Sequence, residues 1–308
     1  MDLTQHGCGA CGDDRFSPFK RLGDWRLVRC RACDAVYLNP SPSQAELRRL
    51  YTETYFSERR VQEDHSVSAV EQEIGRRMET ARRLIEEVSS QCRWLDIGCA
   101  SGYLIAAGSR LGCEVEGIDI SEWAAAFAVG TLGLKVFTGT LGEFPKASDG
   151  RGYGLITAMA YLEHSATPLE DLKSIAQLLS PGGIFVVRLP NRSSFDRYWH
   201  GDSWHGWHLP YHLYHFTPGS LRRLTERVGL VPYRFDSGFW NPWVHFREAL
   251  RGDGLRADHP LEGRTPSIDP LSSSTDPSEA HASSLITRWK SVIGRVFSGR
   301  DMILYARK

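Results

Sequence analysis

The chain has 308 residues, of which 41% are hydrophobic and 24% are charged. This composition is typical of a globular protein and excludes a chain too polar to form a core. The 37 basic residues balance the 37 acidic residues, so no global positive field attracts polyanions, and nucleic acid is a disfavoured partner. We expect one large core with attached segments, because single cores stop growing near ~250 residues.

The N-terminus and the cysteines predict the compartment. Met1 and Asp2 begin a polar stretch, where a secretory signal would need a basic end and an apolar run. No apolar run approaches the ~20 residues that span a bilayer, so we expect a cytoplasmic protein. Cys92, Cys99 and Cys113 lie in apolar or glycine-rich contexts. In a reducing compartment we expect these three as thiols rather than disulfides.

The other four cysteines form two close pairs. Cys8 and Cys11 are followed, after eighteen residues, by Cys30 and Cys33. Two Cys-x2-Cys turns at this separation are typical of a four-cysteine zinc site, and a module this small needs a metal to stay folded. The sequence therefore predicts a structural zinc ribbon over residues 1–40. A redox dithiol is the alternative for a single pair.

Two helices are predicted before the main domain. Residues 41–44 read Ser-Pro-Ser-Gln, an N-cap, a first-turn proline and the glutamine of a capping box, which predicts a short helix through Leu50. From Val67 to Val88 apolar residues recur at three- and four-residue steps, on one face of a long helix. We interpret residues 41–90 as a helical cap.

From Arg93 onward, short apolar strands alternate with helix-length segments, which predicts a parallel sheet covered on both faces. Capping patterns predict helix starts at Thr167 and at Thr217, each followed by proline. Strands are predicted at 94–98, 113–120, 134–137, 153–159, 184–189, 232–236 and 302–306.

An insertion is predicted over residues 240–300. Its stretch from about Arg251 to Ser284 is rich in Ser, Pro, Gly and Asp and cannot bury a core, so we expect a loop or a disordered segment. Residues 285–298 place apolar side chains on one helical face among Arg and Lys. We expect this helix to dock on the main domain, with weak membrane-surface contact as the alternative.

The most informative motif is a glycine turn after the 94–98 strand. Gly98 and Gly102 allow the backbone to approach a ligand closely, and Asp119 at the end of the next strand can accept ribose hydroxyls. Ala100 and Tyr103 occupy positions where a dinucleotide fingerprint needs glycine, and the Gly-Lys-Ser/Thr ending of a P-loop is absent. The sequence predicts a nucleoside ligand. Because the nearby Asp96 would repel a pyrophosphate, we expect that ligand to carry an ammonium or sulfonium.

The ordered motifs resemble a class I S-adenosylmethionine-dependent methyltransferase with an N-terminal zinc-binding head. The matching runs are Leu-Asp-Ile-Gly-Cys-Ala-Ser-Gly from residue 95, Val-Glu-Gly-Ile-Asp-Ile-Ser from 115, Tyr-Leu-Glu-His from 161, Leu-Ser-Pro-Gly-Gly from 179, Leu-Pro-Asn from 189 and His-Leu-Tyr-His-Phe-Thr-Pro from 212. The resemblance implies an α/β fold: a Rossmann-like, doubly wound, seven-stranded sheet over residues 91–308 with its last strand antiparallel.

The resemblance also implies a cofactor site for S-adenosyl-L-methionine. Asp96, Gly98 and Gly102 would surround the methionine part, and Asp119 would bind the ribose. Thr140 stands where an acid often faces the adenine amine. The remaining residues implied to contact the cofactor are Ala100, which replaces a common glycine, Ile120 and Tyr161.

Methyl transfer to a hydroxyl or carbon acid also needs a base, and histidine is the default. His164 follows the fourth strand at the rim of the sheet. Residues 195–216 are dense in aromatic residues and histidine, which indicates an acceptor-binding lid; His212 is the first choice for the base there and His215 the second.

Two other interpretations of this segment stay open. The first is a packed aromatic loop whose histidines are only hydrogen-bonded. The second is another metal site, formed by His205, His208, His212 and His215. We disfavour that site because no acidic or cysteine partner accompanies this set of four histidines.

The sequence as a whole predicts a methyltransferase of small molecules such as sugars, lipid-linked acceptors or natural products. O-Methylation is slightly favoured over C-methylation. The alternatives are a zinc-finger RNA methyltransferase and a non-catalytic cofactor-binding protein. The oligomeric state is left open.

Overall fold

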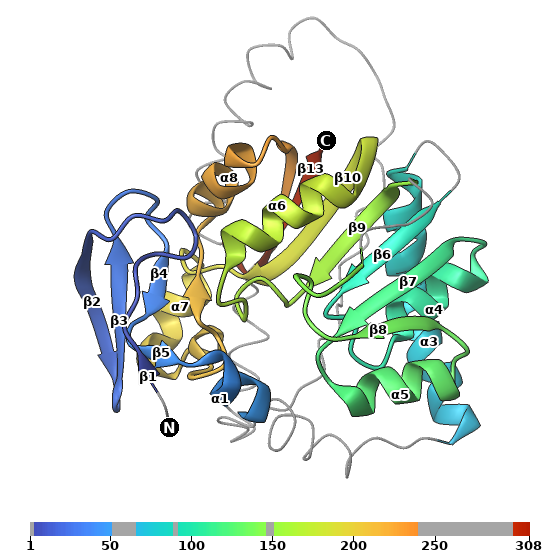
Figure 1. Cartoon of the computed structure of the whole chain (residues 1–308), viewed down its shortest axis with the longest axis horizontal. Helices are drawn as coiled ribbons and strands as arrows, with labels where there is room; N and C mark the ends of the chain where they lie inside the picture. The colour runs from blue at the N-terminus through green and yellow to red at the C-terminus, as the bar shows by residue number, and fades with distance from the viewer. Residues whose placement is uncertain (1–2, 51–65, 89–91, 146–150, 240–297) are drawn as a thin grey trace, which may run out of the picture.

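The fold combines a small N-terminal β module with an α/β domain (Figure 1). It is seen in a computed structural model of the chain, which describes residues 3–50, 66–88, 92–145, 151–239 and 298–308. The helices are α1 (Gln44–Arg49), α3 (Val67–Glu86), α4 (Tyr103–Arg110), α5 (Glu122–Gly130), α6 (Pro168–Leu178), α7 (Phe195–His200) and α8 (Pro218–Arg227).

The α/β domain contains a seven-stranded sheet in the order β12-β13-β10-β9-β6-β7-β8. Every neighbouring pair from β10 to β8 is parallel, whereas β13 runs antiparallel to both β10 and β12. This confirms the predicted fold class. The strands are β6 (Arg93–Ile97), β7 (Glu114–Asp119), β8 (Lys135–Thr138), β9 (Tyr153–Met159), β10 (Leu179–Pro190), β12 (Val231–Phe239) and β13 (Ser298–Arg307).

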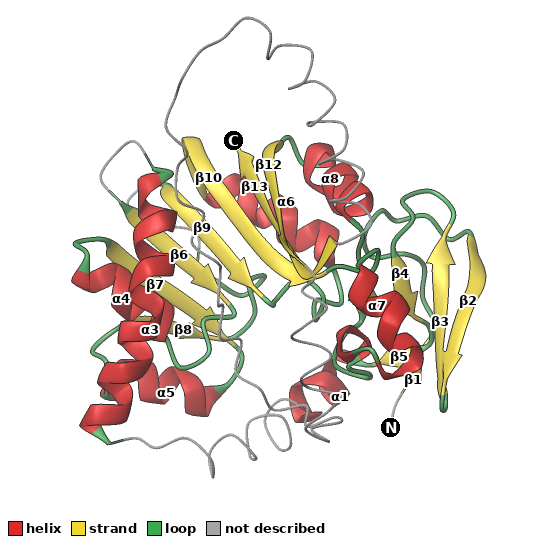
Figure 2. Cartoon of the chain, turned by 180° about the vertical axis from the view of Figure 1, so that it is seen from behind, coloured by secondary structure: helices red, strands yellow, loops and turns green. Residues whose placement is uncertain are grey.

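Helices cover both faces of this sheet, with α3 and α4 on one face and α6 and α8 on the other (Figure 2). Side chains alternate along β6 as the pleat requires: Trp94 packs with α3 and α4, whereas Leu95 and Ile97 share a core with α6. The helix predicted over 67–88 buries Val70 and Ile74 in the cluster that contains Trp94. It therefore belongs to the helical layer of the sheet rather than to a separate cap.

Two helix starts differ from the predicted capping. Ser43 is the N-cap of α1, because its hydroxyl accepts a hydrogen bond from the Glu46 amide at 3.3 Å, while the preceding two residues form strand β5 (Ser41–Pro42). Thr167 precedes α6 without a side-chain cap. The predicted start at Thr217 is confirmed, and its capping box is completed by Ser220.

The prediction that Cys92 and Cys113 are thiols is wrong in this structure. The two residues form a disulfide, with their Cα atoms 4.8 Å apart. They precede neighbouring parallel strands whose register pairs Arg93 with Glu114. That register places Cys92 beside Cys113. The sequence around each cysteine does not reveal this pairing, because it depends on how the two strands align. Cys99 is a buried free thiol.

The N-terminal module consists of β1 (Leu3–Thr4), β2 (Phe16–Leu22), β3 (Trp25–Cys30), β4 (Val36–Leu38) and β5. The sheet β2-β3-β4 gains a fourth strand, β11 (Tyr214–His215), from the chain between β10 and α8. Buried residues of the module and of the α/β domain belong to one continuous hydrophobic core, which includes Leu27, Tyr37 and Leu172. The module is thus part of the main core rather than an appendage.

Most of the predicted insertion lies outside the described part of the chain: the Ser-rich stretch, residues 285–297 of the predicted helix and its membrane contact. The prediction is wrong for residues 298–300, which begin β13 and therefore belong to the sheet. Among the helices that are described, none is both long enough and apolar enough to cross a membrane.

The contact between α4 and β6 predicts a sharp difference between two glycines. A Cβ added at Gly108 would lie 2.6 Å from the Trp94 ring, so Gly108→Ala should lower the free energy of unfolding by about 1–3 kcal/mol through overpacking. At Gly75, on the exposed side of α3, an added Cβ meets no atom within 4 Å. Gly75→Ala should therefore raise the free energy of unfolding by about 0.5–1 kcal/mol, because alanine favours the helix over glycine. Urea denaturation of both variants measures this. Equal effects would contradict the packing described.

Candidate active site

The glycine turn at the end of β6 is locked to the end of β7 by Asp119. One carboxylate oxygen accepts the Ala100 amide at 2.7 Å, and the other accepts the Ser121 amide at 2.8 Å. Gly98 and Gly102 have φ values of 73° and 78°, in the left-handed region that glycine tolerates. Ala100 also lies there, at 48°, so the substitution of alanine for the common glycine is accommodated with strain.

Asp96 lies beneath this turn and is 3% exposed. Its Oδ1 accepts a hydrogen bond of 2.5 Å from the Thr157 hydroxyl, and that hydroxyl accepts the Trp94 indole N–H at 2.7 Å. Burial raises the pKa of the Asp96 carboxyl to about 7. The carboxyl is therefore poised between its neutral and ionised forms near neutral pH, and a cationic ligand nearby would favour the ionised form.

Two further residues predicted to contact the cofactor, Tyr161 and Thr140, follow β9 and β8. The Tyr161 ring packs against Gly98, where an added Cβ would lie 3.1 Å from Cδ2, and its hydroxyl donates to Asp171 at 2.9 Å. Thr140 donates both its amide and its hydroxyl to Glu143 at 2.8 Å. An acid thus lies beside the position where the sequence places only a threonine.

Beyond β9, Glu163, His164 and His212 converge. One ligand atom from each lies within 4.8 Å of the others, and the two imidazole rings meet edge to face with centroids 4.6 Å apart. Burial raises the pKa of Glu163 to about 8 and holds that of His212 well below its usual value. His164 is half-buried and is the most exposed of the three. The structure therefore brings together two of the three predicted base candidates.

The third candidate, His215, lies apart from this group. It is 3% exposed and packs edge to face on the Trp207 ring, and burial lowers its pKa to about 3. Trp204 is buried as well, whereas Tyr198 and Trp199 on α7 are largely exposed. Much of the predicted lid is consequently packed core, consistent with the alternative interpretation of an aromatic loop.

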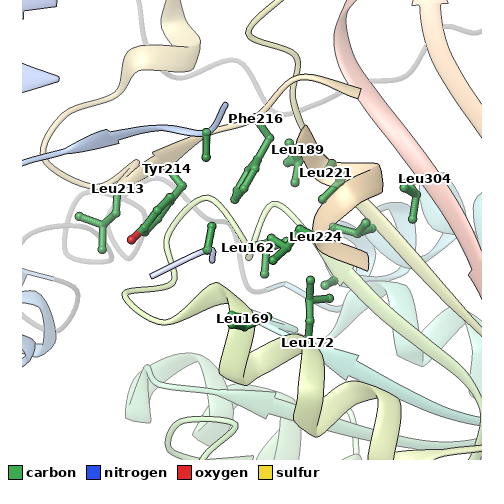
Figure 3. Packing of buried hydrophobic residues seen from close by; sticks show 14 of the residues in the cluster. Leu162, Leu169, Leu172, Leu189, Leu213, Tyr214, Phe216, Leu221, Leu224 and Leu304 are labelled. Atoms are coloured by element: carbon green, nitrogen blue, oxygen red, sulfur yellow. The ribbon is translucent and has the colours of Figure 1, made fainter. Parts of the chain in front are cut away.

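The 195–216 segment is held between the N-terminal module and the loop after β9. The Glu163 carbonyl accepts the amides of Leu213 and Tyr214 at 2.7 and 3.0 Å. On the side of the N-terminal module, the Tyr214 hydroxyl accepts a hydrogen bond from the Gly9 amide at 2.8 Å, and the Tyr214 ring stacks on Tyr37. Figure 3 shows Leu213, Tyr214 and Phe216 of this segment packed in one cluster with leucines of α6 and α8.

The four N-terminal cysteines form a buried cluster at the base of the module. Their sulfurs all lie within 4.8 Å of one another; Cys8 and Cys33 are separated by 3.6 Å, and Cys11 and Cys30 by 3.4 Å. Sulfurs in a tetrahedral zinc site lie about 3.8 Å apart, given Zn–S bonds of about 2.3 Å. The donor set and its spacing fit such an ion. Arg223 donates to the Cys33 carbonyl at 2.9 Å, which ties this cluster to α8.

Comparison with known proteins identifies the family. A family profile described as "Methyltransferase domain" matches residues 55–233, more than half of the chain. The chain belongs to this methyltransferase family. The match extends from residues before α3 to the start of β12 and includes the glycine turn, Asp119 and the Glu163–His212 group.

Individual relatives agree with this family. Ubiquinone biosynthesis O-methyltransferase of Cereibacter sphaeroides is 32% identical over 160 residues, and that of Dinoroseobacter shibae is 30% identical over 165. Each match covers 49% of this chain and 64% of the relative, so the chain spans less than two thirds of their length. Magnesium protoporphyrin IX methyltransferase of Synechocystis, solved with bound SAH, matches with a TM-score of 0.50 at 16% identity, covering 86% of this chain and 100% of that one. That likeness concerns the fold.

Sequence reasoning missed two acids of this methyltransferase domain. Glu163 stands beside His164 in the quoted Tyr-Leu-Glu-His run, and an acid among apolar neighbours after a buried strand is the signal that could have singled it out. Glu143 had a weaker signal, since it lies three residues after Thr140, at the spacing of a turn.

The bridge through Tyr214 predicts a cost for losing one hydroxyl. Tyr214→Phe removes the acceptor of the Gly9 amide, and we expect it to lower the free energy of unfolding by about 1–2 kcal/mol. The control is Tyr233→Phe, because that hydroxyl bonds Glu87 at an exposed position and its loss should cost little. Thermal or urea denaturation measures the stability of both variants. If both variants unfold like the wild type, the Tyr214 bridge contributes nothing.

Proposed function

We propose that the chain is an S-adenosylmethionine-dependent methyltransferase that methylates an oxygen atom of a small molecule. The family supports methyl transfer, and the O-methyltransferase relatives support oxygen as the acceptor atom. The observation that carries the proposal is the position of the polar Glu163–His164–His212 group after β9, next to the strand that ends in the glycine turn. The formal net charge of +0 supports a small acceptor rather than nucleic acid.

The donor would bind across the ends of β6 and β7. Asp96 and the glycine turn suit the charged amino-acid part of the donor, and the free lone pairs of the Asp119 carboxylate suit the ribose hydroxyls. Ile120, which follows Asp119 and is half-buried, would contact the adenine. Glu143 beside Thr140 would supply the acid that the adenine amine needs.

S-Adenosylmethionine, when bound, supplies a methyl group on a sulfonium. An acceptor oxygen would bond to that methyl carbon as the carbon–sulfur bond breaks, and the acceptor would give up its proton. Alignment and exclusion of water provide much of the acceleration. We assign the handling of the acceptor proton to the Glu163–His164–His212 group, because it lies at the carboxyl edge of the sheet and His164 reaches the surface.

We also propose that the four N-terminal cysteines hold a structural zinc ion. Four buried thiols with this spacing match the donor set that zinc prefers, and the ion would fix the module against which the 195–216 segment rests.

The proposed function is tested by mass spectrometry of the full chain with isotope-labelled S-adenosylmethionine and phenols, sugar nucleotides or cell extract. Label should appear on an oxygen of a small molecule. Glu163→Gln and His164→Ala should lower kcat about 10²- to 10⁴-fold, because a positioned proton acceptor contributes in that range. Glu226→Gln, on the exposed side of α8, is the control. Full turnover in both variants would remove the group from the mechanism.

The donor site gives a second prediction. Asp119→Ala should weaken binding of S-adenosylmethionine by about 1.5–3 kcal/mol, roughly tenfold to more than a hundredfold, measured by calorimetry. Asp236→Ala, which changes an exposed acid on β12, should bind like the wild type. Since Asp119 also braces the turn, the melting temperature of each ligand-free variant is measured as well. Unchanged affinity in a folded Asp119→Ala chain would contradict the ribose assignment.

The zinc proposal predicts what metal removal does. Chelation, or Cys30→Ser, should remove the zinc ion from the cysteine cluster and lower both the melting temperature and kcat, because the module supports β11 beside His212. Cys99→Ser, which alters a buried thiol outside the cluster, should keep that zinc. A chain that contains no metal, or keeps its stability after chelation, would contradict the proposal.

A further inference from the structure

The group beyond β9 has the composition of a metal site as well as of a base. Two histidines and one carboxylate, Glu163, His164 and His212, come from two segments almost fifty residues apart and offer ligand atoms within 4.8 Å of one another. We infer that these three side chains bind a divalent transition-metal ion such as Zn²⁺, in addition to any ion held by the four cysteines. Two imidazole nitrogens and one carboxylate oxygen form a common ligand set for such ions.

Hydrogen bonds to the backbone fix both imidazole rings in the form that binds metal. Nδ1 of His164 lies 3.0 Å from the Tyr211 carbonyl oxygen, and Nδ1 of His212 lies 2.9 Å from that of Gly206. A carbonyl oxygen can only accept, so each Nδ1 carries the proton and each Nε2 carries the lone pair of a neutral ring. Metal-binding histidines nearly always donate their other ring nitrogen in this way.

The carboxylate of Glu163 supplies the independent observation that a ligand is needed. The residue is 1% exposed, and its Oε2 has no hydrogen-bond partner within the described ranges. Burying a carboxylate oxygen without a partner is costly, and a bound cation offsets that cost. No salt bridge to Glu163 occurs among the described residues, so a cation in the group would be the direct partner of this carboxylate.

The structure also explains why the histidines of the 195–216 segment do not form a site by themselves. His205 bonds Arg300, and His215 packs on Trp207. Only His212 of these joins the metal-binding group, whose carboxylate, Glu163, comes from the loop after β9.

Three protein ligands leave coordination positions open, as catalytic metal sites do. An acceptor oxygen bound at such a position would lose its proton more readily, because the ion stabilises the oxyanion. This catalytic role rests on the proposed function, whereas the binding of the ion does not.

The test counts metal in the full chain. After saturation with Zn²⁺ and removal of loosely bound ions, elemental analysis should find about two zinc ions per wild-type chain and about one in Glu163→Gln and in His212→Gln. Glu226→Gln and His200→Ala, which change exposed residues of the same types, should keep two. A wild-type chain that holds no more zinc than both site variants would overturn the inference.

A second measurement does not depend on the variants' folding. Co²⁺ added to wild-type chain whose cysteine cluster already holds Zn²⁺ should give visible d–d absorption without the intense thiolate-to-cobalt bands of a cysteine site. Absence of this absorption would overturn the inference too. If Co²⁺ binds in this way but no acceptor is methylated, the proposed function fails and the metal site stands. If the chain methylates an acceptor but binds no ion at Glu163, His164 and His212, the metal site fails and the proposed function stands.

Discussion

One pair of hydrogen bonds holds the candidate site together: the Glu163 carbonyl accepts the amides of both Leu213 and Tyr214. Glu163 follows β9, Leu213 precedes β11 and Tyr214 begins it, so the bonds join the carboxyl edge of the sheet to the strand that completes the N-terminal module. His164 and His212 flank this junction and are placed together by it. The part of the site proposed to bind the donor depends on the turns after β6 and β7, whereas the part proposed to bind the acceptor depends on this long-range junction.

Much of the α/β domain could be predicted from sequence because its signals are local. Short apolar runs predicted β6, β7, β8 and β9 within a residue or two, and the Thr-Pro pairs at 167 and 217 predicted the starts of α6 and α8. The residues proposed to bind the donor were equally predictable. Gly98 follows β6, Gly102 is the N-cap of α4 and Asp119 ends β7, so the topology alone brings them together.

The remainder depends on contacts between distant residues, which periodicity does not encode. The disulfide between Cys92 and Cys113 follows from the register of β6 and β7. Glu163 joins His212 only because β11 crosses to the module. For the same reason the tryptophans of the 195–216 segment, which read as a ligand-binding wall, divide into buried Trp204 and Trp207 and exposed Trp199. Aromatic density indicated an important segment without indicating which side of it faces solvent.

The strand exchange between β11 and β4 means that sequence boundaries and folding units differ in this chain. Deleting the first forty residues to obtain a minimal enzyme would leave β11 as an exposed sheet edge and strip apolar cover from Phe216 and Leu213. Conversely, the N-terminal module alone would lack β11, one of the four strands of its sheet. A chimera that joins this N-terminal module to another catalytic domain should therefore also carry β11, because the module and β11 complete one sheet and would have to change together in evolution.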